Sequence, residues 1–218
     1  MKLWCWRVRN TLSDRRIPSE IEDRHEPKVA RMQPNGDRIR EALLFLIGEA
    51  DKRKIDITQY TILKACFLAD RSHLNRFGRP ITFDNYSAMK DGPVASRLYG
   101  VLKHETTSLS AIGLRRPAWQ RQAAPQISER AFVFSRPSRK YDADILSESD
   151  IEALSEALTV VASLSFSQIR KLTHGDPAYI AAWRDDGNKK AYDMNLGLFF
   201  DIPNFEKAEE LAFISKHV

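Results

Sequence analysis

The chain has 218 residues, of which 43% are hydrophobic and 29% are charged, and its formal net charge is +5 at pH 7. This is enough apolar material for one domain with a buried core, or for one domain and an arm. No apolar run approaches the roughly 18 residues that cross a membrane. Basic residues follow the short N-terminal apolar patch, the opposite order to a signal peptide, so we expect a soluble, cytoplasmic protein.

The N-terminal segment differs from the rest of the chain. Residues 1–31 hold eight Lys or Arg and five Asp or Glu, a net charge of +3, so the other 187 residues carry only +2. This nearly neutral body indicates no strong nucleic-acid-binding field. Residues 1–35 lack a regular apolar period, and we interpret them as a flexible basic arm, or alternatively as sequence upstream of a translation start at Met32. Residues 36–218 form the predicted domain.

Apolar residues spaced as on one helix face predict helices over residues 37–53 and 59–77. Thr58 is the expected N-cap of the second helix, and Gly78 ends it. Around its centre this helix is apolar on nearly every side, which is typical of the buried middle of a bundle. Cys66 lies there and is expected to be a small core residue, since two cysteines argue against a disulfide framework.

The middle of the chain mixes extended and helical patterns. Residues 78–94 predict a short extended segment with a turn at its end, followed by a helix over 95–104. Residues 106–130 are expected to form a basic loop, and 131–135 a short strand. The later helices have start signals. These signals are Ser147 with Asp150, Ser165 with Gln168, Asp176 before a proline and Asn204.

The motifs of metal, nucleotide and acyl-transfer chemistry are missing from the sequence. It has no His-Glu-x-x-His, no Cys-x-x-Cys, no glycine-rich phosphate loop and no Gly-x-Ser-x-Gly elbow. We therefore expect no metal or other cofactor. His174 with Asp176 is the most suggestive catalytic pair, but residues 172–175 also match a helix C-terminus, where the helix dipole favours a histidine. We favour the structural interpretation.

Other polar and aromatic residues allow two interpretations each. Asp70 could line a binding cleft with Lys64, or it could pair with a nearby cation because buried charges must be compensated. The turn at residues 90–93 could contact a partner or simply close a hairpin. Trp183 is typical of a core aromatic. Trp119 lies in an arginine-rich loop and could bind a protein, stack on single-stranded nucleic acid or be a pinned surface aromatic.

Several separated segments resemble, in the same order, those of Panacea-domain proteins of the SocA-like family. Residues 62–70 resemble the Lys-Leu-Leu-Tyr-Leu-Ala-Asp-like run of that family, although Ala65-Cys66 replaces Leu-Leu and Phe67 replaces a frequent Tyr. Further similar segments are His73-Leu74, Phe77–Ile81, Tyr86, Ala88–Lys90, Gly92–Val94, Leu98-Tyr99, Leu102-Lys103, Leu146–Asp150 with Leu154, Leu172–His174 and Ala182-Trp183. Together they cover roughly residues 39–186.

The resemblance implies a mainly α, compact helical domain with a small β-sheet. Members of the family occur in phages, prophages and bacterial genomes. Many are antitoxins that bind and neutralise a toxin protein encoded by a neighbouring gene. The founding member also delivers its toxin to a bacterial protease, which we expect to be an ATP-dependent one. The family offers no catalytic residues, so the resemblance implies a binding protein and not an enzyme.

We therefore expect an antitoxin of a toxin–antitoxin system that acts by direct protein binding. The expected partner-binding surface draws on Asp70, Tyr86, Met89, Lys90, Gly92, Pro93, Trp119, His174 and Trp183. The alternatives are a nucleic-acid-binding regulator that uses the scattered basic residues, and a hydrolase that uses His174. We expect no sequence-specific nucleic acid binding and no membrane partner.

Overall fold

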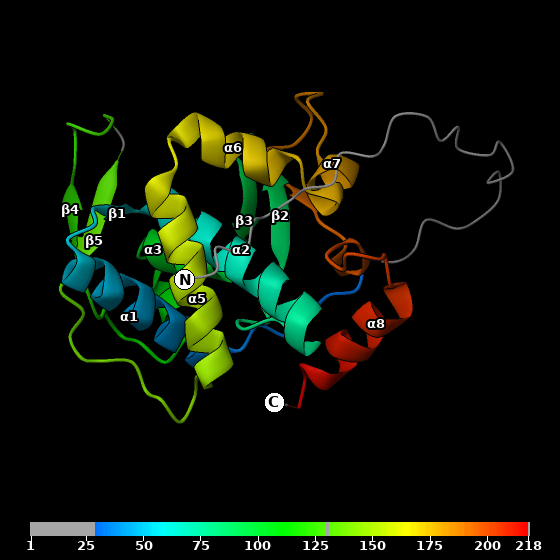
Figure 1. The fold of residues 1–218 in the computed structure, drawn as a ribbon, viewed down its shortest axis with the longest axis horizontal. Coiled ribbons are helices and arrows are strands. Elements are labelled where there is room, and N and C mark those ends of the chain that lie inside the picture. The colour runs from blue at the N-terminus through cyan, green and yellow to red at the C-terminus, as the bar shows by residue number, and fades with distance from the viewer. Residues whose placement is uncertain (1–28, 130, 218) are drawn as a thin grey trace, which may run out of the picture.

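Three long helices form the core of the fold. The computed structural model describes residues 29–129 and 131–217. In it, α1 (Gly36–Arg53) and α2 (Gln59–Phe77) pack with α5 (Glu148–Ser163). Figure 1 shows α5 lying across the other two, with the smaller helices and strands around them. The helix α2 is buried on nearly every side along residues 62–70, as its sequence predicts.

Local capping chemistry sets where these helices begin and end. Thr58 accepts a hydrogen bond from the backbone N–H of Thr61, whose hydroxyl accepts one from the backbone N–H of Thr58, and this closes a capping box at the start of α2. Gly78 then ends α2 with a left-handed backbone (φ 79°), which glycine adopts without steric cost. Ser147 and Asp150 form the same box at the start of α5. The start signals read from the sequence are confirmed.

The β-structure is divided between two small antiparallel sheets, each of three strands in the described part of the chain. One has the order β1-β5-β4 and the other the order β3-β2-β6. The first sheet contains β1 (Ile57–Thr58), β4 (Gln120–Ala123) and β5 (Phe132–Ser135). The second contains β2 (Tyr86–Met89), β3 (Gly92–Ala95) and β6 (Tyr192–Asp193). The prediction of a mainly α fold with a small sheet is confirmed, with two small sheets in place of one.

Shorter helices surround the core. They are α3 (Ser96–Leu102), α4 (Thr106–Ser110), α6 (Phe166–His174), α7 (Pro177–Ala182), a 3₁₀ turn at Leu196–Leu198 and α8 (Phe205–Ile214). The prediction that residues 106–130 form a loop is wrong in part, since α4 and β4 lie within them. None of the helices in the described part of the chain has the length and apolar character needed to cross a membrane.

The predicted boundary between arm and domain falls beside residues that contact the body. Residues 1–28 of the predicted arm lie outside the described residues. Met32 is buried, and its backbone N–H donates to Asn85 Oδ1 over 2.9 Å. The backbone N–H of Gln33 donates to Ser215 Oγ over 2.8 Å. The division at residue 35 stays a prediction, and these contacts favour a domain that begins nearer Met32.

A chain that starts at Met32 should fold with nearly the stability of the full chain. Among the described residues it loses the ion pair between Arg31 and Asp193, whose side chains are 62% and 49% exposed, and such exposed pairs contribute about 0–1 kcal/mol. Thermal denaturation followed by circular dichroism should give a Tm within about 5 °C of the full chain. Arg31→Ala in the full chain removes the same ion pair and is the control. A drop in Tm of more than about 5 °C that this variant does not show would contradict the prediction.

Candidate functional site

A buried lysine of α2 holds the β2–β3 hairpin. Lys64 is 1% exposed, and its Nζ donates a hydrogen bond to the carbonyl oxygen of Pro93 over 2.7 Å. Gly92 lies directly above this amine with φ +101°, and a Cβ at that position would come within 2.9 Å of Lys64 Nζ and 2.8 Å of Thr173 Oγ1. Only glycine fits so close an approach at a positive φ. Gly92 and Pro93 therefore allow the hairpin to pack closely against α2 and α6.

Burial makes Lys64 easy to deprotonate. Removal from water disfavours the charged amine and lowers its pKa to about 7, and the negative charge of Asp91 offsets part of this effect. The ring of Tyr60 lies 5.2 Å from Nζ and gives a further favourable contact to the ammonium form. Near neutral pH, Lys64 therefore exchanges between its charged and neutral forms.

Asp70, one and a half turns further along α2, holds the other end of the hairpin. Its carboxylate accepts hydrogen bonds from the backbone N–H groups of Ile81 (2.8 Å) and Thr82 (3.0 Å), from the Thr82 hydroxyl and from Tyr86 Oη (2.8 Å). Burial raises the pKa of Asp70, and these donors oppose that rise. The expectation that Asp70 pairs with a Lys or Arg is wrong, because hydrogen bonds compensate its charge.

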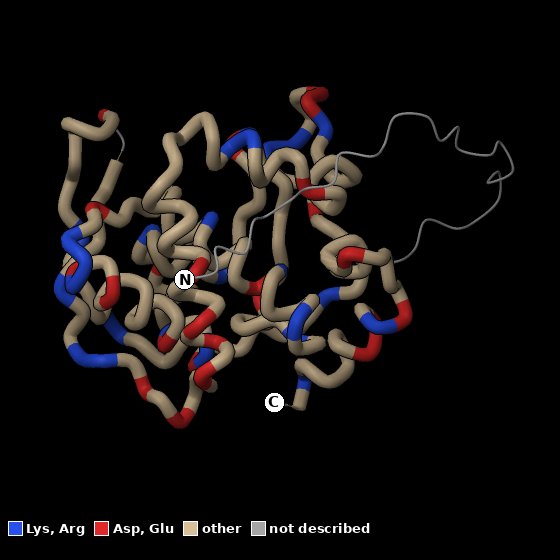
Figure 2. Tube along the Cα trace, viewed as in Figure 1, with Lys and Arg blue, Asp and Glu red and all other residues tan. Residues whose placement is uncertain are grey.

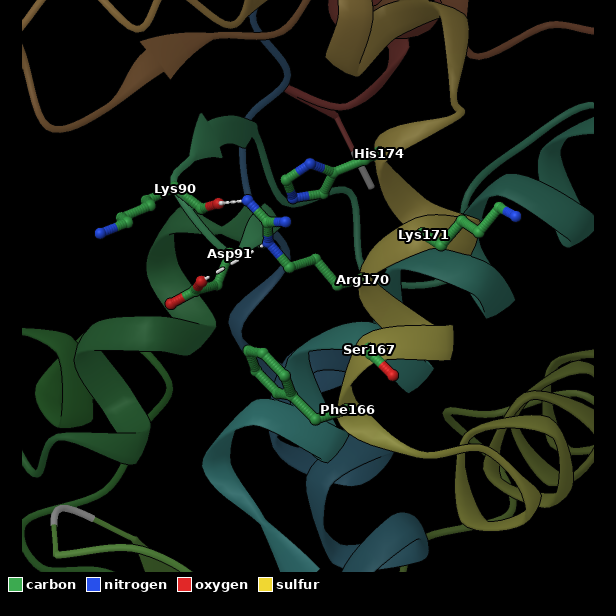
Figure 3. Close-up of a pocket in the computed structure, with 7 residues that line it drawn as sticks. All are labelled: Lys90, Asp91, Phe166, Ser167, Arg170, Lys171 and His174. Carbon is green, nitrogen blue, oxygen red and sulfur yellow. Dashed lines mark hydrogen bonds and ion pairs between the residues drawn. The ribbon is translucent and has the colours of Figure 1, made fainter.

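A pocket of about 520 Å³ opens between the hairpin tip and α6. We call it the hairpin-tip pocket. Its lining residues are Lys90, Asp91, Phe166, Ser167, Arg170, Lys171 and His174. Figure 3 shows Arg170 reaching from α6 towards the hairpin tip, between His174 and Phe166, while the Lys90 and Lys171 amines extend away from it.

Arg170 connects the two walls of the hairpin-tip pocket through long contacts. Its Nε lies 3.8 Å from the Asp91 carboxylate, and its Nη2 lies 3.4 Å from the carbonyl oxygen of Lys90. The side chains of Arg170 and Asp91 are 45% and 59% exposed, so this ion pair is screened by water. The guanidinium therefore keeps most of its hydrogen-bonding capacity for other acceptors.

Aromatic side chains continue the site on both sides of Arg170. The ring of Phe166 packs on that of Tyr60 at a centroid distance of 4.7 Å, yet Phe166 remains 54% exposed. His174 stacks on Tyr179 at 4.3 Å, and Tyr179 in turn lies 6.1 Å from the ring of Trp183. Burial, with the nearby charges of Arg170 and Lys64, lowers the pKa of His174. Its imidazole is therefore neutral at pH 7.

The structure does not support His174 and Asp176 as a catalytic pair. The Asp176 carboxylate lies 2.6 Å from Arg71 Nε and accepts hydrogen bonds from two N–H groups at the start of α7. It thus caps a helix and neutralises an arginine. His174 is the last residue of α6, next to the capping Gly175. The favoured interpretation of this histidine as part of a helix end agrees with its position.

The structure brings some of the nine expected surface residues together and buries others. Lys90 and His174 line the hairpin-tip pocket, and Gly92 and Pro93 lie beneath it. Met89 is half-buried and accepts a hydrogen bond from Tyr179 Oη through its carbonyl oxygen (2.9 Å). Trp183 is also half-buried, in contact with Tyr179 and Tyr192.

Five of the nine expected surface residues are buried and have little surface to offer a partner of the folded protein. They are Asp70 (1% exposed), Tyr86 (5%), Trp119 (6%), Gly92 and Pro93. These five therefore lie inside the fold and not on the expected surface. Asp70 and Tyr86 bind one another inside the fold, and Trp119 packs in the hydrophobic core.

Sequence reasoning missed Phe166 and Arg170, and it included Asp91 only as part of the turn at residues 90–93. The apolar Phe166 at the first position of α6 was an available signal, because Ser165 already marks the start of that helix and leaves the position exposed. Nothing local distinguishes Arg170 from other helical arginines. Its role depends on the hairpin, which lies about eighty residues earlier in the chain.

Replacing Asp70 should destabilise the protein because several buried donors would lose their acceptor. Asp70→Ala should lower the free energy of unfolding by more than about 2 kcal/mol, and Tyr86→Phe by about 1 kcal/mol. Urea denaturation measures both. Asp56→Ala, at an exposed position, is the control and should change stability by less than about 0.5 kcal/mol. If Asp70→Ala changed the free energy of unfolding by less than about 0.5 kcal/mol, the structural role of Asp70 would be contradicted.

The lowered pKa of Lys64 should make the protein more stable as pH rises above neutral. An unfolded chain keeps the ordinary, higher lysine pKa, so above pH 7 it binds a proton that the folded state has released. The free energy of unfolding should rise by about 1–2 kcal/mol from about pH 7 to about pH 9. Above that range the raised pKa values of Cys66 and Tyr60 act in the opposite sense.

Urea denaturation at the two pH values measures this effect, and Lys64→Met is the comparison. The methionine keeps most of the length of the side chain but cannot titrate, so the rise should disappear. An equal rise in both proteins would show that another group causes it.

Comparison with known proteins places this site in a family. The model of the family described as antitoxin SocA-like, Panacea domain, matches residues 62–179, more than half of the chain. No curated protein and no solved structure matches the chain. The matched range contains Lys64, the whole β2–β3 hairpin, α6 and every residue that lines the hairpin-tip pocket. The chain belongs to the SocA-like antitoxin family and carries its Panacea domain.

Proposed function

We propose that this protein is the antitoxin of a toxin–antitoxin pair and that it neutralises a toxin protein, encoded by a neighbouring gene, through direct binding in the cytoplasm. Its membership of the SocA-like antitoxin family is the observation that carries the proposal. The proposal excludes catalysis, which is supported by the engagement of Asp176 with Arg71 and α7.

The hairpin-tip pocket and the adjoining surface of α6 and α7 form the proposed toxin-binding surface. The pocket exposes Phe166 (54%) together with Arg170 and Lys90, and α7 exposes Ile180 (62%). Aromatic and arginine side chains supply much of the binding energy at protein interfaces, particularly where apolar neighbours exclude water. The buried side chains of Ile169 and Thr173 fix α6 on the core, and the hydrogen bond from Lys64 fixes the hairpin. A partner would therefore meet a surface that loses little entropy on binding.

Co-expression with the neighbouring gene tests the proposed function. The wild type should rescue growth and co-purify with the toxin. Phe166→Ala should weaken rescue and complex formation together, by about tenfold or more in affinity, because it removes an exposed aromatic of the surface. Phe213→Ala is the matched control, since Phe213 is 65% exposed on α8, outside the matched range. His174→Gln keeps a hydrogen-bond donor on the pocket wall, so it should weaken rescue less than Phe166→Ala does.

The result that would contradict this proposal is rescue without a detectable complex, together with loss of rescue by His174→Gln alone. That combination requires chemistry at the histidine. Tight binding of one defined DNA sequence at physiological salt would instead favour a nucleic-acid-binding regulator.

Delivery of the toxin to an ATP-dependent protease is a separate part of the proposal, supported by the resemblance to the family's founding member. The half-life of the toxin in cells distinguishes the two routes. Delivery predicts that the antitoxin shortens the half-life of the toxin and that loss of the protease restores it. A half-life unchanged or lengthened by the antitoxin indicates neutralisation by binding alone.

A further inference from the structure

The guanidinium of Arg170 has few good hydrogen-bond acceptors. Its contacts with Lys90 and Asp91, 3.4 and 3.8 Å long, exceed the 2.7–3.2 Å of ordinary N–H···O bonds. A guanidinium carries five donors in a planar fork that matches a carboxylate in two parallel bonds. Figure 3 shows this fork beside the His174 ring, with only the long contacts to the Lys90 carbonyl oxygen and to Asp91 drawn from it. The Arg170 guanidinium is therefore placed to bind a further hydrogen-bond acceptor in the pocket.

Polar atoms without partners among the described residues lie on the pocket wall, at His174, and behind the ring of Phe166, at Tyr60. In the described part of the chain, His174 Nε2 and Tyr60 Oη are buried and make no hydrogen bond. Tyr60 lies under the exposed ring of Phe166, and the ammonium of Lys64 lies 5.2 Å from the ring of Tyr60. A buried polar group without a partner is costly, so its environment favours a ligand or a bound water that completes its bonding. Here Tyr60 can donate, as can one tautomer of His174, and Lys64 adds positive charge.

We propose that the hairpin-tip pocket binds the carboxylate of an aspartate or glutamate side chain of the toxin, with Arg170 as its main partner. This inference rests on the proposed function and specifies the chemistry of its binding site. Asp91 is exposed and weakly paired, so it can turn into solvent when the incoming carboxylate takes its place on the guanidinium. The exposed ring of Phe166 offers an apolar wall for the methylene groups of the same side chain.

The surroundings of the pocket favour a protein carboxylate over a nucleic acid phosphate. A polyphosphate chain is bound by several cations spaced along its backbone. In the pocket, Arg170 is opposed by Asp91, and the Lys90 and Lys171 amines extend away. Figure 2 shows Lys and Arg positions interspersed with Asp and Glu positions along the described backbone. A single arginine beside an aromatic wall suits a single acidic side chain.

A small probe tests this inference without the toxin. N-acetyl-glutamate N-methylamide is titrated into the full-length protein at constant ionic strength, and binding is followed by NMR. The glutamine analogue, equal in shape but uncharged, is the control ligand. We expect saturable shifts at Arg170 and His174 with the glutamate probe alone. Arg170→Gln should weaken binding by about tenfold or more. Lys52→Gln removes the same charge from an exposed position on α1 that does not line the pocket, and it should change binding by less than about twofold.

Each outcome decides for or against the carboxylate site. Equal binding of the glutamate and glutamine probes, or equal effects of the two variants, would overturn the proposal. So would tighter binding of inorganic phosphate at the same residues, which would indicate phosphate recognition. Circular dichroism confirms that both variants fold. The proposed function is judged separately by toxin rescue: a toxin that binds Arg170→Gln as tightly as wild type contradicts the carboxylate site and leaves neutralisation intact.

Discussion

Two buried ionisable side chains on one helix fix the position of the hairpin. Lys64 binds the carbonyl oxygen of Pro93 at one end, and Asp70 binds Tyr86 and the segment before it at the other. Both side chains are about 1% exposed, so each must satisfy its charge or polarity within the fold. The hairpin and the segment just before it supply those partners. The helix and the hairpin are therefore mutually dependent, because displacing the hairpin would leave Lys64 buried without its acceptor and would remove the Tyr86 donor from Asp70.

This arrangement determines the geometry of the hairpin-tip pocket. Gly92 approaches Lys64 and Thr173 so closely that the tip rests on both α2 and α6. With the tip placed there, Asp91 and the carbonyl of Lys90 come within reach of Arg170. The close packing of the hairpin backbone on α2 and α6 therefore creates the pocket. Exposed side chains form only its outer surface. Such a site is largely formed before a partner arrives, which lowers the entropic cost of binding.

The parts of the structure that the sequence predicts are those with local signals. The starts of α2, α5, α6 and α7 can be predicted from capping residues that lie within three positions of each helix start. Contacts between residues that are far apart in the sequence have no such local signal. Trp119 looks like a surface residue of an arginine-rich loop, yet β4 and the core bury it. Likewise, the partners of Asp70 come from a segment after the helix, so a nearby cation was the natural but incorrect expectation.

The helix α6 separates the residues that hold the fold from those that face outward. Ile169 and Thr173 are buried, whereas Phe166 and Arg170, on the adjoining flank of the same helix, are exposed. Substitutions at exposed positions usually change stability by less than about 0.5 kcal/mol, far less than changes in a core. The outer face of α6 can therefore change its side chains, and with them the partner it suits, while the hairpin stays seated on Lys64 and Asp70. A domain built this way can change the chemistry of this surface and keep its fold, because its exposed side chains and its buried ones are different residues.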